Sequence, residues 1–181
     1  PGLRSASGKL SIAAVPAGMP VEGFVDASYD RRGAAVEFRD SWLRTSASRL
    51  RFDGALNSHV RVDLESTGLD DILHVAATAA GRAPSEVPVA LRGGAVRFRG
   101  SVSGGLDKLK ASGQIEATRL VFRGRLFERL EAELSASASQ FNARKILAAR
   151  QDARLQGELT AALRGWRFDR NSPIRANLSL R

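Results

Sequence analysis

The segment Val96-Arg-Phe98-Arg-Gly100-Ser-Val102 contains the two patterns that decide the fold of this chain. Alternate residues of a β-strand lie on one face, so Val96, Phe98 and Val102 share a face and the arginines lie on the other. Gly100 falls on the apolar face, although a glycine packs nothing in a strand and costs backbone entropy. We therefore expect a strand that contacts water on one side and bends toward its apolar side at the glycine.

The pattern apolar–x–Gly–x–apolar recurs from one end of the chain to the other. It also occurs in Ala6-Ser-Gly8-Lys-Leu10, Val21-Glu-Gly23-Phe-Val25, Phe52-Asp-Gly54-Ala-Leu56, Ala111-Ser-Gly113-Gln-Ile115, Phe122-Arg-Gly124-Arg-Leu126 and Leu155-Gln-Gly157-Glu-Leu159. Turn-forming residues separate such alternating runs, as in Arg92-Gly93-Gly94 and Gly104-Gly105. The sequence predicts an all-β fold: a curled, elongated, mostly antiparallel sheet, shaped as a trough, of about a dozen short strands.

One segment breaks the alternation. In Leu69-Asp-Asp-Ile-Leu-His-Val-Ala-Ala-Thr-Ala-Ala80-Gly81 the apolar residues recur at helical spacing. Asp70 can cap the start of a helix and Gly81 can end it. We expect one short helix near residues 70–80, followed by a proline-rich loop.

The two halves of the chain resemble each other. Three positions recur at a constant offset, Phe38, Gly54 and Leu56 as Phe141, Gly157 and Leu159. This offset predicts a single repeat-built β domain over residues 1–181, with a first unit in 1–68, a helix and loop insertion in 69–94, and a second unit in 95–181. The absence of an initiator methionine and the alternating run at the C-terminus indicate a fragment of a longer protein.

The residues that usually carry chemistry are sparse. The chain has no cysteine and only two histidines, His59 and His74, so neither disulfides nor thiolate metal sites are possible. We expect no enzyme, no catalytic residue, no cofactor and no metal. The formal net charge of +9 suits an anionic partner. However, Phe98 alternates with Arg97 and Arg99 and so lies on the opposite face, which argues against base stacking and nucleic-acid binding.

The glycine-punctuated strands, the helix start Leu69-Asp-Asp-Ile72 and the run Gly100-Ser-Val-Ser-Gly-Gly-Leu-Asp-Lys-Leu-Lys-Ala-Ser-Gly113 resemble the AsmA-like and TamB-like family. The strand Phe127-Glu-Arg-Leu130-Glu-Ala-Glu-Leu134 is similar to the one that follows this linker in that family. The resemblance implies a β-taco, a U-shaped sheet with a hydrophobic inner surface. It also implies a periplasmic location in a parent protein anchored in the inner membrane, with neighbouring repeats and an outer-membrane barrel as partners. The implied roles are lipid transport and outer-membrane biogenesis in the cell envelope.

The first hypothesis is a groove that carries phospholipid or other acyl lipid between the two membranes. Its expected lining is Phe38, Leu50, Phe52, Val60, Val62, Val96, Phe98, Val102, Ile115, Phe122, Leu130, Leu134, Phe141, Leu155, Leu159 and Leu163. Two alternatives use the same residues. A chaperone-like groove or sheet edge would assist outer-membrane protein assembly, and a structural β-sandwich would bury them in a dry core.

Overall fold

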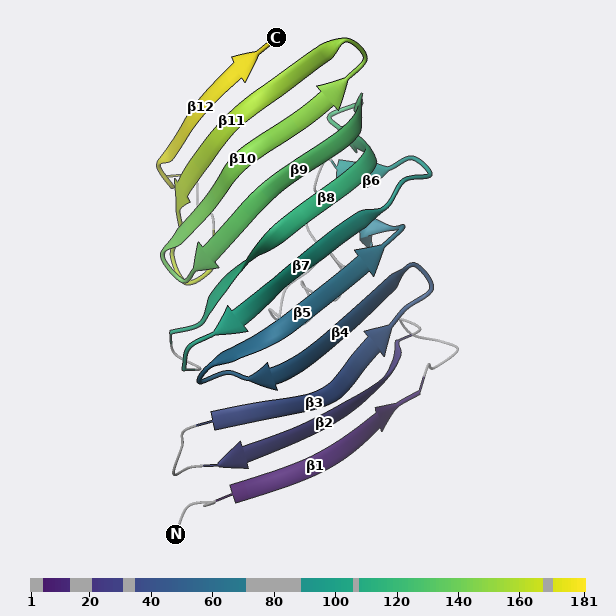
Figure 1. Cartoon of the computed structure of the whole chain (residues 1–181), viewed down its shortest axis with the longest axis vertical. Helices are drawn as coiled ribbons and strands as arrows, with labels where there is room; N and C mark the ends of the chain where they lie inside the picture. Colours follow the sequence, from purple (N-terminus) through teal and green to yellow (C-terminus); the bar gives the residue numbers. More distant parts are fainter. Residues whose placement is uncertain (1–4, 14–20, 31–34, 71–88, 106–107, 168–170) are drawn as a thin grey trace.

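The computed structural model describes residues 5–13, 21–30, 35–70, 89–105, 108–167 and 171–181. These residues form one antiparallel sheet of 12 strands (Figure 1). The strands are β1 (Ser5–Ile12), β2 (Glu22–Asp30), β3 (Ala35–Arg44), β4 (Ser48–Ala55), β5 (His59–Ser66), β6 (Val89–Leu91), β7 (Val96–Ser103), β8 (Lys110–Phe122), β9 (Arg125–Ser137), β10 (Gln140–Arg150), β11 (Ala153–Ala162) and β12 (Ile174–Leu180). The expected all-β fold and strand number are confirmed.

The order of the strands in the sheet follows the order of the chain. The path runs from β1 to β12 through neighbouring antiparallel pairs, and the short strand β6 stands off this path and pairs with β8. β1 and β12 are the two edges, so the sheet is open. With strands about 4.8 Å apart, the path spans roughly 50 Å.

The described strands form a single layer. Wherever two strands make extensive contact, they are hydrogen-bonded neighbours in the sheet. The accessible surface of the chain is 12663 Å², whereas a compact monomer of this mass exposes about 8,500 Å². An open sheet produces such an excess, because no second layer of described strands covers either face. The alternative of two sheets packed as a sandwich is therefore wrong for the described residues.

Two β-bulges keep apolar residues on one side of the sheet. In β3, Phe38 and Ser41 pair with residues of β4 only two apart, and the extra residue Asp40 has a φ of 43°. In β10 the register shifts between Ala143 and Ile146, and Lys145 has a φ of 49°. A bulge adds one residue to one strand, so side chains an odd number of positions apart reach the same face.

The β8–β9 connection differs from the sequence-based expectation. The stretch around Gly124 was expected to be a strand, but Arg123 and Gly124 have φ angles of 48° and 76° and form the turn between two hydrogen-bonded strands. Positive φ at both central residues is typical of a type I′ hairpin turn, which matches the strand twist. β8 consequently runs to Phe122, although Arg119 within it has a φ of 50°.

Most of the predicted helix near residues 70–80 lies outside the described part of the chain. Leu69 and Asp70 are helical, and residues 71–80 are not described.

Residues that the offset between the halves relates do not have equivalent partners in the sheet. Phe38 lies opposite Gly54, whereas its counterpart Phe141 lies opposite Ala161. The division into 1–68, 69–94 and 95–181 remains a prediction.

Candidate functional site

One row of small and apolar residues crosses the whole sheet. Residues that are directly opposite in an antiparallel pair share a face, so the register can be followed from strand to strand. From β1 to β12 the row consists of Gly8, Ala27, Phe38, Gly54, Val60, Val102, Ala111, Ala136, Phe141, Ala161 and Ile174. We call the side of the sheet that carries this row the apolar face.

Further rows on the apolar face repeat this composition. One consists of Ile12, Gly23, Leu43, Leu50, Leu64, Phe98, Ile115 and Ala132. Another consists of Ser41, Phe52, Val62, Gly100, Gly113, Leu134, Ala143, Leu159 and Ala176. A third consists of Ser48, Ser66, Val96, Ala117, Leu130, Ala148, Leu155 and Leu180. No charged side chain lies in these rows.

The serines of these rows satisfy their hydrogen bonds locally. The Oγ of Ser41, which is 2% exposed, accepts a bond from the backbone N–H of Asp26 at 3.1 Å. The Oγ of Ser66 lies 2.9 Å from that of Ser48 and donates to the carbonyl oxygen of Gly68 at 2.7 Å. Hydroxyls with internal partners need no water, so they do not make the apolar face hydrophilic.

Phe98 covers the glycines at the centre of the apolar face. Gly100 and Gly113 lie directly opposite each other in β7 and β8. The Cζ atom of Phe98 lies 2.6 Å and 2.7 Å from the points that a Cβ on Gly100 and on Gly113 would occupy. The backbone oxygen of Arg99 is 2.5 Å from the same point on Gly113. A side chain at Gly113 would therefore meet both the ring and the neighbouring strand, which explains glycine inside a strand.

The most exposed large side chains of the apolar face lie in the two edge strands. Val60, Ala117 and Ala161 are less than 5% exposed. At the edges, Leu10 in β1 is 59% exposed and Leu180 in β12 is 71% exposed. Leucines so exposed on a contiguous apolar surface are typical of a surface that binds a partner or a ligand.

The opposite side, which we call the charged face, carries ion pairs between neighbouring strands. In β5 and β7, for example, Glu65 lies opposite Arg97 and Asp63 lies opposite Arg99. Exposed pairs of this kind contribute little stability each, but they keep this side wetted. The ion pairs between strands are Lys9–Asp26 at 3.5 Å, Arg97–Glu65 at 3.0 Å, Arg99–Asp63 at 3.7 Å, Lys145–Glu133 at 2.6 Å, and Arg44–Glu22.

Glu37 and Arg39 form an ion pair within β3, with the Arg39 guanidinium 3.0 Å from the carboxylate. This hydrogen bond, together with the charge of Arg39, lowers the pKa of Glu37 below its ordinary value. Both side chains of the pair are largely exposed to water.

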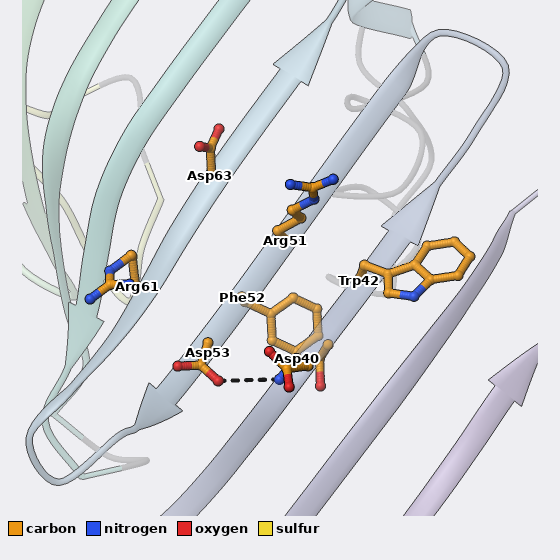
Figure 2. A pocket seen from close by; sticks show the side chains of 8 residues that line it. Asp40, Trp42, Arg51, Phe52, Asp53, Arg61 and Asp63 are labelled. Carbon is orange, nitrogen blue, oxygen red and sulfur yellow. Dashed lines mark hydrogen bonds between the residues drawn. The ribbon is translucent and has the colours of Figure 1, made fainter.

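A hollow of about 380 Å³ lies on the charged face (Figure 2). Its lining is Asp40, Ser41, Trp42, Arg51, Phe52, Asp53, Arg61 and Asp63. Arg51 lies opposite Asp63 and Arg61 opposite Asp53, so positive and negative charges alternate across it. The Asp53 carboxylate accepts a hydrogen bond from the backbone N–H of Asp40 at 3.2 Å. Opposite charges at this spacing offset one another, and the hollow has no single-sign field for an ion.

The structure brings nearly all of the expected lining residues to the apolar face. Fourteen of the sixteen lie in its rows: Phe38, Leu50, Phe52, Val60, Val62, Val96, Phe98, Val102, Ile115, Leu130, Leu134, Phe141, Leu155 and Leu159. Leu163 is 8% exposed and follows the last residue of β11, with its backbone N–H bonded to the carbonyl of Ser139 at 2.8 Å.

Phe122 is not joined to these rows. It lies opposite Arg125 in β9 and Val89 in β6. Between Ala117, which lies on the apolar face, and Phe122, the residue Arg119 has a φ of 50°, so period-2 alternation along β8 does not carry the face assignment on to Phe122. The ring is 42% exposed, and the Arg123 guanidinium lies 5.6 Å from its centre.

Several apolar-face residues were missing from the expected lining, notably Leu43, Leu64 and Ile146. Leu64 could have been included, because it continues the alternation of Val60 and Val62. Leu43 and Ile146 follow the bulges of β3 and β10, which alternation alone does not reveal.

His59 lies at the exposed start of β5, with its Nδ1 3.2 Å from the Oγ of Ser58. His74 lies outside the described residues. Within the described ranges, no three His, Cys, Asp or Glu side chains are grouped as metal ligands. In the same part of the chain, no helix has the length and hydropathy needed to cross a membrane.

No family model matches the chain, and no curated protein or solved structure matches it either.

Proposed function

We propose that the chain is a lipid-carrying segment of a periplasmic bridge, in which the apolar face holds phospholipid acyl chains on their way between the inner and outer membranes. The observation that supports this proposal is the unbroken row from Gly8 to Ile174, which crosses the open sheet without a polar side chain. Neighbouring repeats of a longer parent protein would extend the same face. The resemblance to the AsmA-like and TamB-like family points in the same direction.

An acyl chain fits such a face because its recognition requires no directional hydrogen bond. Each methylene removed from water contributes about 0.8 kcal/mol, wherever along the row it lies. A chain can therefore slide from one strand to the next at nearly constant free energy. The headgroup stays in water at the ends of the strands, and no residue performs a chemical step.

The test is native mass spectrometry of the purified chain after incubation with phospholipid vesicles. The proposal predicts bound phospholipid in the unmodified chain and its loss in Leu159→Asp, which places a charge on the apolar face. Gln156→Asp is the matched control, because it adds the same charge to the opposite face of the same strand.

A second pair of variants covers the case in which Leu159→Asp does not fold. Leu178 in β12 is 50% exposed, so Leu178→Asp removes little packing, and its neighbour Asn177 provides the control Asn177→Asp. Unmodified chain that binds no phospholipid, or lipid retained by both apolar-face variants, would contradict the proposal.

The unpaired edges favour a second candidate, a chaperone-like surface for outer-membrane strands. Every residue of β12 is exposed, and its outer edge has no strand partner among the described residues. Such an edge can accept an extended peptide by β-augmentation. In that case, amide hydrogen exchange of β12 would slow when a peptide of alternating apolar residues is added, whereas a lipid-only surface would leave it unchanged.

A further inference from the structure

The strand ends around the β8–β9 and β10–β11 turns carry a cluster of arginines, which we call the basic rim. The backbone N–H of Arg92 bonds to the carbonyl of Arg119 at 3.0 Å, so the end of β6 lies beside the end of β8. The two turns lie at the same end of the neighbouring strands in Figure 1. The rim consists of Arg92, Arg119, Arg123, Arg125, Arg150 and Arg154, all of them exposed.

Within the described part of the chain, the arginines of the basic rim have no carboxylate partner. Among the described residues, none of them forms an ion pair, although Glu128 and Asp152 lie at the same end of the strands. At the same end of the sheet, the earlier strands β2 and β3 differ from the rim, because the charge of Arg44 is paired with Glu22. Among the described residues, the unpaired arginines at this end therefore lie around β6 and β8 to β11.

Part of the basic rim continues the apolar face. Arg150 lies opposite Ala153, two pairs beyond the pair of Ala148 and Leu155 on that face. Arg154 alternates with Leu155, so it lies at the same strand end on the charged side. A molecule whose tail lies on these residues would hold its polar end within reach of the rim.

We propose that the basic rim selects anionic phospholipids over zwitterionic ones, an inference that rests on the proposed function. Arg150 stands at the end of the apolar face, and the other rim arginines surround the same strand ends, where the headgroup of a lipid on that face would lie. A zwitterionic headgroup adds an ammonium group that offsets its phosphate, whereas an anionic headgroup retains a net negative charge. Each arginine near an anionic lipid surface favours binding about fivefold.

The experiment offers the chain equimolar phosphatidylglycerol and phosphatidylcholine with identical acyl chains and measures the ratio bound by native mass spectrometry. The unmodified chain is expected to bind the glycerol lipid in several-fold excess. The rim variant Arg150→Gln/Arg154→Gln is expected to bind the glycerol lipid in a clearly smaller excess without losing total lipid. Arg49→Gln/Arg51→Gln is the control, because it removes the same charge from the charged face beside the hollow of Figure 2.

The outcomes separate this inference from the proposed function. Absence of both lipids from the unmodified chain would overturn the proposed function and the selectivity with it. Three results would overturn the selectivity alone. They are lipid bound by the unmodified chain without preference, an undiminished preference in the rim variant, and a loss of preference in the control equal to that in the rim variant. An independent measurement uses the unmodified chain: about 1 M salt should abolish the preference for the anionic lipid but not the binding of lipid.

Discussion

Replacing Gly113 by alanine tests whether the apolar face needs glycine where neighbouring strands approach. The new Cβ would lie 2.5 Å from the Arg99 carbonyl oxygen, 2.6 Å from the Gly100 Cα and 2.7 Å from the Phe98 Cζ. Overpacking of this kind costs about 1–3 kcal/mol, and the reduced entropy of the unfolded chain returns about 0.4–1 kcal/mol. Gly113→Ala should therefore lower the free energy of unfolding by about 1–2 kcal/mol.

Urea denaturation followed by circular dichroism measures this change. With a slope of about 2 kcal/mol per molar urea, the midpoint should fall by roughly 0.5–1 M. Gly8→Ala is the matched control, because Gly8 lies on the same face in the edge strand β1 and a Cβ there meets nothing within 4 Å. That variant should raise stability by about 0.4–1 kcal/mol.

A third variant separates the two sources of strain at Gly113. Phe98→Leu removes the ring from above the glycine pair but leaves the backbone contacts in place. In a Phe98→Leu background, Gly113→Ala should cost less than in the unmodified chain without becoming stabilising. The reasoning would be refuted if Gly113→Ala stabilised the chain as much as Gly8→Ala does.

Three further changes have defined outcomes. Ser41→Ala removes the acceptor of the Asp26 N–H inside the β3 bulge and should cost about 1–3 kcal/mol in thermal or urea unfolding; an unchanged midpoint would show that this bond contributes nothing. Arg123→Asn places the residue that type I′ turns favour before glycine and should raise the melting temperature slightly, whereas a decrease would argue against the turn type. Arg39 lowers the pKa of Glu37, so their contribution to stability is present above the unfolded-state pKa near 4.5 and is lost as pH falls through the folded-state value. Glu37→Gln should flatten that part of the pH–stability curve, and an unaltered curve would contradict this assignment.

Period-2 alternation was sufficient to predict the fold class and most of the apolar face. It works here because consecutive strands are neighbours in the sheet, so each hairpin carries the same face forward. Val60, Phe98 and Leu159 could be assigned to one side without knowing how their strands pair. A single-layered sheet also leaves the alternation undisturbed, because no second layer requires apolar residues on the charged face.

The failures occurred where the backbone departs from extended geometry. Gly124 was taken for a strand glycine because its local pattern equals that of Gly113, and only the positive φ of Arg123 distinguishes the turn. The bulges at Asp40 and Lys145 shift the alternation by one residue. Lysine gives no compositional sign of a positive φ, and aspartate, although enriched there, does not by itself distinguish a bulge from an ordinary strand position. Pairing with the neighbouring strands fixes these conformations, so single-sequence periodicity does not reveal them.

The most direct test of the central claim locates a bound lipid on one side of the sheet. Two leucines of neighbouring strands serve as reporters, Leu134 on the apolar face and Leu147, which lies opposite Glu131 on the charged face and is 44% exposed. In methyl-labelled chain with a saturated fatty acid bound, intermolecular NOEs from the acyl methylenes should reach Leu134 and other apolar-face methyls but not Leu147. NOEs to Leu147 alone, or to neither residue under conditions where the lipid is bound, would contradict acyl-chain carriage on the apolar face.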